Sequence, residues 1–147
     1  MTLLVTRADV DRILSTHRAQ AMDLLIQNVE DGYREIADGS ATEHPRVYLR
    51  SKNDPQRRPP GLFSMSALLG NAKRMGTRLL ALGGAVYADG DAILILFDQD
   101  SKKCLSIVWD QSLHSYRTGA PAAVAAKRMA KPDSVSPRWA GPDAACS

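Results

Sequence analysis

Three arginines, at positions 46, 78 and 117, are the side chains of this sequence best suited to bind an anion. A guanidinium group is planar and always charged, and its parallel N–H groups match the two oxygens of a carboxylate. Arg117 is followed by Thr118, which offers a hydroxyl, and by Gly119, which permits close approach of the backbone. The residue types alone leave two interpretations open, namely arginines that bind a carboxylate or arginines on a solvated surface.

Metal and disulfide chemistry have less support in the sequence. The three histidines, His17, His44 and His114, are scattered and lack the spacing of metal ligands. Two distant cysteines, Cys104 and Cys146, indicate neither a disulfide framework nor a metal site, and Cys104 lies in an apolar run that predicts a buried small hydrophobe. We therefore expect no metal.

The composition is that of an ordinary globular domain. The chain has 147 residues, of which 44% are hydrophobic and 24% charged, and no apolar run approaches the roughly 18 residues of a membrane span. The start lacks a basic region before a long apolar run, so we expect no secretory signal and a cytoplasmic location. The net charge of +3 is spread along the chain, and aromatic residues are only 5%. We expect neither a nucleic-acid nor a membrane partner.

The first forty residues have a helical pattern. Thr6 and Asp9 resemble a capping box at the start of one helix. A second helix is predicted from about Arg18 to Asp38, and Gly39 is a plausible stop. Its apolar side chains share one face, which we expect to lie in the core: Ala21, Leu24, Leu25, Val29, Tyr33 and Ile36.

The middle of the chain predicts strands. Residues 46–50 alternate, with Val47 and Leu49 on one face and Arg46, Tyr48 and Arg50 on the other. Further short apolar runs are separated by turns too short for crossover helices, which predicts antiparallel neighbours: residues 61–69, 78–82, 92–98 and 104–109.

An alanine-rich helix follows over about residues 111–130, and Gly119 and Pro121 are expected to kink or split it. The order of elements predicts an α+β domain with N-terminal helices on a mostly antiparallel sheet. We assign residues 1–130 to this domain and 131–147 to an irregular tail.

A dinucleotide-binding site is not predicted. No Gly-x-Gly-x-x-Gly follows a strand, and Gly83-Gly84 precedes a strand and is predicted to form a turn. Without a strand–turn–helix unit to hold a pyrophosphate, hydride transfer has no cofactor. We therefore expect that neither NAD nor NADP binds this chain alone.

Over about residues 3–134 the sequence resembles the ornithine cyclodeaminase/μ-crystallin family. The segment from Leu94 to Ser134 is the most specific part, and the Pro45-Arg46 step, the Phe63-Ser64-Met65 strand and the Gly76-Thr77-Arg78 strand occur in the family's order. The matching features of that segment are Asp98, Asp110, Arg117-Thr118, Ala122 to Ala126, and Lys131-Pro132-Asp133-Ser134.

The resemblance implies a domain that binds substrate and forms a homodimer, joined in the family to a Rossmann domain for NAD or NADP. Family members act on small α-amino or α-imino acids; ornithine cyclodeaminases, ketimine reductases and alanine dehydrogenases are examples. It also implies roles for individual residues. Arg46, Arg78, Arg117 and Met65 are expected to bind substrate, and Thr118 the cofactor.

Arg78 departs from the family pattern, because many members have a lysine there that contacts substrate and assists proton handling. Arginine stays charged, so Arg78 is expected to hold a carboxylate but not to act as an acid or base. Ornithine cyclisation is therefore not the predicted reaction.

The sequence after Ser134 does not continue into the family's glycine-rich loop. We interpret the chain as the amino-terminal part of such an enzyme, inactive alone, truncated or altered by a frameshift near Ser134. The alternative is a non-catalytic module that binds small carboxylates or forms dimers. In either case apolar sheet surface is left uncovered, so we expect self-association or poor solubility.

Overall fold

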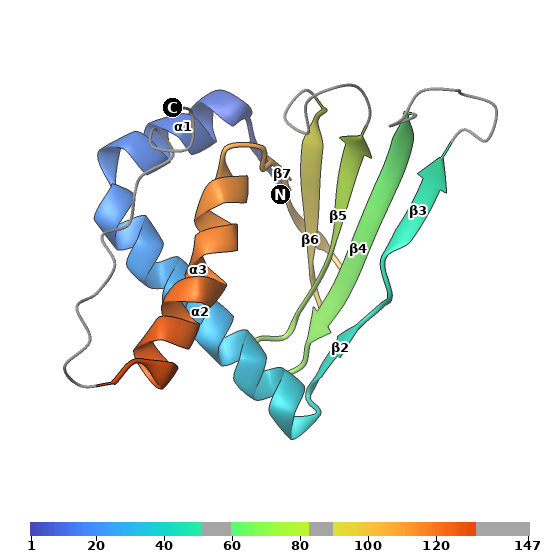
Figure 1. Ribbon diagram of the computed structural model, residues 1–147. Helices are drawn as coiled ribbons and strands as arrows, with labels where there is room; N and C mark the ends of the chain where they lie inside the picture. Colours follow the sequence, from blue (N-terminus) through green and yellow to red (C-terminus); the bar gives the residue numbers. More distant parts are fainter. Residues whose placement is uncertain (51–59, 83–89, 132–147) are drawn as a thin grey trace.

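The structure is a computed structural model that describes residues 1–50, 60–82 and 90–131, and it contains one sheet with three helices on one side (Figure 1). The predicted tail from residue 132 onward and Cys146 lie outside the described residues. The elements in chain order are β1 (Leu3–Val5), α1 (Arg7–Thr16), α2 (Arg18–Asp38), β2 (Ala41–Glu43), β3 (Val47–Arg50), β4 (Gly61–Leu69), β5 (Arg74–Leu82), β6 (Ala92–Asp98), β7 (Cys104–Trp109) and α3 (Leu113–Met129).

The sheet has seven strands in the order β1-β7-β6-β5-β4-β2, and β3 also pairs with β4. Every pair is antiparallel except β1 with β7, which is parallel. The α+β class and the mostly antiparallel sheet are confirmed. The short connections between β4, β5, β6 and β7 in the sequence explain the antiparallel order, because a parallel pair needs a longer crossover.

The sheet has two chemically different faces, since side chains alternate along each strand. We call the side toward α2 and α3 the helix face and the opposite side the outer face. The register places Phe63, Leu80 and Ala92 on the helix face, where they form a buried cluster against which Met65 packs. The core of the sheet therefore lies toward the helices.

The predicted capping box at the start of α1 is confirmed. The Thr6 hydroxyl accepts from the Asp9 backbone N–H at 3.3 Å, and the Thr6 N–H donates to the Asp9 carboxylate at 3.1 Å. The predicted stop of α2 is confirmed as well, because Gly39 caps it with φ of 79°, a conformation that favours glycine.

Three strands differ from the sequence prediction. β1 and β2 were not predicted, since three-residue strands have almost no periodicity of their own and form by pairing with β7 and β4. β5 begins at Arg74 rather than at residue 78, because its first residues pair with β4 and β6 despite their polar character.

The apolar stripe predicted on α2 is largely not core. Leu24, Tyr33 and Ile36 are each about half exposed, at 52%, 49% and 53%. The buried residues of α2 are instead two carboxylates, Glu30 and Glu35. Glu30 accepts from Lys127 and Arg128 in the last turn of α3. Polar contacts thus decide which side of α2 faces inward.

The predicted split of the helix at Gly119 and Pro121 is wrong, because α3 is one helix from Leu113 to Met129. The alternative of a kink there stays a prediction. Proline removes one intrahelical hydrogen bond. Gly119, Ala120 and Val124 are all buried, and α3 packs along α2 (Figure 1). We attribute the continuity of α3 to this packing, which outweighs the local preference.

Glu35 ties α2 to the β4–β5 turn. Its carboxylate is buried and accepts from the backbone N–H groups of Asn71 at 3.0 Å and Ala72 at 3.2 Å. We expect Glu35→Ala to lower the free energy of unfolding by about 1–3 kcal/mol, because two hydrogen bonds from the β4–β5 turn to a buried carboxylate are lost. Urea unfolding measures this, with the exposed Asp23→Ala on the same helix as control. Equal effects of both changes would contradict the assignment.

Candidate functional site

Met65 of β4 and Arg78 of β5 form a row on the helix face with Arg46, the residue that immediately precedes β3. Met65 of β4 is directly opposite Arg78 of β5. On the other side of β4, Val47 is opposite Ser64 and the His44 N–H donates to the Ser66 carbonyl, so Arg46 lies level with Met65. The Arg46 guanidinium carbon is 6.0 Å from the centre of the buried Phe63 ring, which keeps the side chain on the helix face.

This row lines a cavity of about 290 Å³. Arg46, Met65 and Arg78 all contribute to its wall, together with the apolar side chains of Leu94 and Leu96. Three of the four predicted substrate-binding residues therefore share one cavity. Arg117 is not among the described residues that line it.

Arg78 is a buried cation with free donors. It is 6% exposed, and its Nε donates to Asp110 Oδ2 at 2.5 Å, while Asp110 is 3% exposed. The terminal nitrogens Nη1 and Nη2 are buried and have no hydrogen-bond partner among the described residues. Buried polar groups normally have partners, so this guanidinium has room for an additional acceptor.

Arg117, on α3, lies close enough to the row to be influenced by it. Burial lowers the pKa of Arg117, and the charges of Arg78 and Arg46 lower it further, while Asp110 opposes this effect. Its Nε is buried without a partner among the described residues. The charges of Arg78 and Arg46 thus act on a third guanidinium group in the helix layer, and a bound anion would offset this repulsion.

His114 orients Arg117. The two side chains meet at 2.8 Å between Arg117 Nη2 and His114 Nδ1. Arginine can only donate, so Nδ1 accepts and the imidazole is neutral with its proton on Nε2. The pKa of His114 is lowered by burial and by the charges of Arg117 and Arg78, which favours this neutral form.

Sequence reasoning did not include Asp110 or His114 among the site residues. Asp110 was part of the family resemblance, but nothing in the sequence showed that it would pair with a side chain 32 residues earlier. His114 stands three residues before Arg117, a spacing that places two side chains on one side of a helix and that was the available signal.

Thr118, predicted to contact the cofactor, directs its hydroxyl to its own helix. Thr118 Oγ1 donates to the His114 carbonyl at 2.7 Å, a common arrangement for threonine inside a helix. The oxygen retains acceptor capacity, and its role toward a cofactor stays a prediction.

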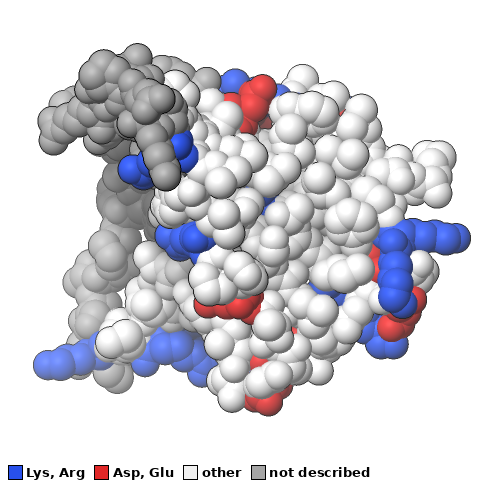
Figure 2. Space-filling view, turned by 90° about the vertical axis from the view of Figure 1, so that its right-hand side faces the viewer, with Lys and Arg blue, Asp and Glu red and all other residues white. Residues whose placement is uncertain are grey.

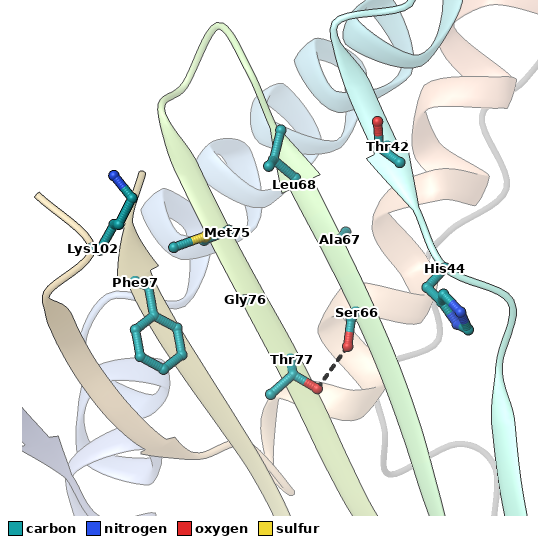
Figure 3. Close-up of a pocket in the computed structure, with 10 residues that line it drawn as sticks. All are labelled: Thr42, His44, Ser66, Ala67, Leu68, Met75, Gly76, Thr77, Phe97 and Lys102. Atoms are coloured by element: carbon teal, nitrogen blue, oxygen red, sulfur yellow. Dashed lines mark hydrogen bonds between the residues drawn. The ribbon is translucent and has the colours of Figure 1, made fainter. Parts of the chain in front are cut away.

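The outer face of the sheet carries a different kind of surface. A wide, shallow hollow of about 520 Å³ is lined there mainly by apolar atoms from β4, β5 and β6. Figure 3 views it with the helices behind the sheet; Leu68, Met75 and Phe97 lie on this side, and Ser66 donates to Thr77 at 3.0 Å. Figure 2, from the side away from the helices, shows a broad uncharged centre with charged residues at the margins.

The described residues offer neither a metal site nor a membrane-spanning helix. No three side chains of histidine, cysteine, aspartate or glutamate come together there in a way that would hold a metal ion. None of the described helices has the length and apolarity needed to cross a membrane. Cys104 is half-buried and carries a free thiol.

Comparison with known proteins decides the family. The sequence profile of the "Ornithine cyclodeaminase/mu-crystallin family" matches residues 6–142. The chain belongs to this family. A search of curated proteins gave no match. The ornithine cyclodeaminase resemblance is thereby confirmed, and with it the prediction that the relatives are NAD-dependent enzymes of amino and imino acids.

Solved structures share the fold. An archaeal alanine dehydrogenase dimer with bound NAD is 27% identical with a TM-score of 0.71, and the match covers 90% of this chain and 38% of that one. A pyrroline-2-carboxylate reductase of Thermococcus litoralis, in complex with NADH and L-proline, is 22% identical with a TM-score of 0.71 over 90% and 39%. A lysine cyclodeaminase is 21% identical with a TM-score of 0.68 over the same shares. This ornithine cyclodeaminase-family chain spans about two fifths of their length.

Proposed function

We propose that residues 1–130 are the substrate-binding and dimerisation domain of an NAD(P)-dependent enzyme that acts on small α-amino or imino acids. The observation that carries this proposal is the buried Arg78 guanidinium with two unpartnered nitrogens on a cavity wall, flanked by Arg46 and approached by Arg117. A carboxylate is the acceptor that such a group of guanidinium donors fits.

Cofactor binding is assigned to a part of the enzyme other than the described residues. The strand-to-helix junctions of the described chain are Thr6, between β1 and α1, and residues 110–112, between β7 and α3. Neither contains the glycines that let a backbone approach a pyrophosphate. These residues therefore do not fit a dinucleotide, and the proposal gives this chain ligand binding without hydride transfer of its own.

The outer face is proposed to join two copies of the chain. Val47, Leu49 and Leu62 lie there and are 41%, 61% and 43% exposed. A continuous apolar area of this kind is unfavourable in water and is typical of an interface. The alanine dehydrogenase relative is described as a dimer, which supports the same assembly here.

The substrate proposal is tested at Arg117. Calorimetry with L-alanine and L-proline should give measurable binding to the unchanged chain, and Arg117→Gln should weaken it about tenfold to a hundredfold, because a charge-assisted hydrogen bond is lost. The matched control is Arg12→Gln, an arginine of α1 with 75% of its side chain exposed. Unchanged affinity in Arg117→Gln, or an equal loss in Arg12→Gln, would refute the proposal.

A second candidate is a non-catalytic module that binds small carboxylates or mediates dimerisation. The missing pyrophosphate cradle among the described residues favours it. The same calorimetry with NAD and NADP separates the two, since binding of an amino acid without either dinucleotide favours the module. Binding of a dinucleotide to this chain would contradict both.

A further inference from the structure

We propose that His44 is a positioning residue that directs the Arg46 side chain into the cavity. It does so through a bulge at the edge of the sheet, between β2 and β3, which decides the face on which Arg46 lies. The proposal rests on the proposed function in one respect, since it takes Arg46 as a side chain that binds the ligand. It adds a residue that acts through Arg46.

The edge of the sheet next to β4 contains one residue more than β4 does between two matched positions. Glu43 is opposite Ala67, and Val47 is opposite Ser64. Three residues of the edge segment, 44–46, therefore face only two residues of β4, 65 and 66. This is the pattern of a β-bulge, and the side chains that follow the extra residue change face.

The extra residue turns Arg46 toward the helix face. Ala67 follows Met65 by two residues and shares its face, so Glu43 lies on the helix face as well. Strict alternation from Glu43 would place position 46 on the outer face. Because of the bulge, Val47 lies on the outer face instead, and both Glu43 and Arg46 line the same cavity. The bulge therefore decides whether this guanidinium can reach a ligand there.

His44 is bonded to both sides of the bulge. Its backbone N–H donates to the Ser66 carbonyl at 3.0 Å, and its ring Nδ1 is 2.8 Å from the Pro45 carbonyl oxygen. A carbonyl oxygen can only accept, so Nδ1 carries a proton and donates. Proline has no N–H that would need a partner, which suits a bulge at a sheet edge. Figure 3 shows the His44 side chain just past the end of β2.

The hydrogen bond to Pro45 acts directly on Arg46. The Pro45 carbonyl belongs to the planar peptide group that leads into Arg46, so fixing this carbonyl restricts the direction in which the arginine side chain leaves the backbone. The Arg46 guanidinium carbon is 6.0 Å from the centre of the Phe63 ring, but Arg46 is exposed, and such a contact at an exposed site is weak. The backbone therefore has to supply much of the order.

Calorimetry of the full chain with L-alanine tests this role in a double-mutant cycle. His44→Leu removes the ring donor and should weaken binding about threefold to tenfold, the effect of one hydrogen bond. Arg46→Gln should weaken binding about tenfold to a hundredfold, because a charge-assisted hydrogen bond is lost. The double variant should bind no more weakly than Arg46→Gln alone, since His44 acts through Arg46. Additive losses would overturn the positioning role.

His44→Asn is the matched control for His44→Leu. The asparagine amide nitrogen occupies the same place along the side chain as Nδ1 and can donate to the Pro45 carbonyl, whereas leucine has a similar shape and no donor. His44→Asn should therefore keep the affinity of the unchanged chain for L-alanine. An equal loss of affinity in the two variants would show that the hydrogen bond does not position Arg46.

Proton NMR without any ligand separates this inference from the proposed function. The Phe63 ring shifts the resonances of the Arg46 side-chain protons as long as that side chain lies over its face. The shift should persist in His44→Asn and decrease in His44→Leu. An unchanged shift in His44→Leu overturns the inference while the proposed function stands. Failure of L-alanine and L-proline to bind, with the shift changed as expected, overturns the proposed function alone.

Discussion

Asp110→Ala is expected to lower the free energy of unfolding by about 3–5 kcal/mol, because it leaves the Arg78 charge buried without its partner. Asp110 and Arg78 are 3% and 6% exposed, and their contact joins β5 to the segment that leads into α3. Loss of the carboxylate therefore leaves an unpaired guanidinium in the buried site, which destabilises the folded state. Urea unfolding followed by circular dichroism measures the change.

The control for this prediction is a double variant, Arg78→Met with Asp110→Leu. Replacing a buried ion pair by apolar side chains of similar size is often neutral or stabilising, so most of the lost stability should return. Carboxylate binding should not return, since the free Nη donors are gone. A double variant as unstable as Asp110→Ala alone would show that the pair itself stabilises the fold and would contradict this account.

Leu62→Lys is expected to weaken self-association by about a hundredfold or more. Leu62 is on the outer face opposite Leu49, and both are largely exposed in the single chain. An added lysine therefore costs the isolated chain little, but in a face-to-face dimer it would place two unpaired charges in an apolar interface. A penalty of about 3 kcal/mol corresponds to that fold-change.

Sedimentation velocity over a range of concentrations measures the change, with Ile36→Lys as control. Ile36 on α2 is 53% exposed and belongs to the helix layer, so its replacement should leave the association unchanged. An unchanged chain that is monomeric throughout, or an equal effect of the two lysines, would show that the outer face does not join two copies.

The sequence predicted those parts of the fold whose local pattern and tertiary contacts agree. The capping box at Thr6, the αL stop at Gly39 and the strands β6 and β7 follow from side-chain spacing and turn chemistry. The apolar stripe of α2 failed as a core prediction because burial depends on what faces the helix. Two carboxylates with partners on α3 and the β4–β5 turn occupy the inward side instead.

The candidate site was predictable only in part for a similar reason. Residue types and the family resemblance selected Arg46, Arg78 and Arg117, but the row with Met65 depends on strand register, which one sequence does not specify. Asp110 could not be paired with Arg78 from the sequence, because the contact spans two strands and their turns.

The row also makes the function of this sheet depend on which side chains of β4 and β5 point to which face. On β4 and β5, successive side chains alternate between the arginine cavity and the apolar outer surface. A one-residue insertion in either strand would exchange the two sets, placing guanidinium groups toward the neighbouring copy and leucines toward the ligand. Such an insertion should abolish both ligand binding and association of the two copies, whereas a substitution can remove either one separately. The hydrogen bonds from the β4–β5 turn to Glu35 fix the position of this turn against α2. They therefore help to keep the two strands in register.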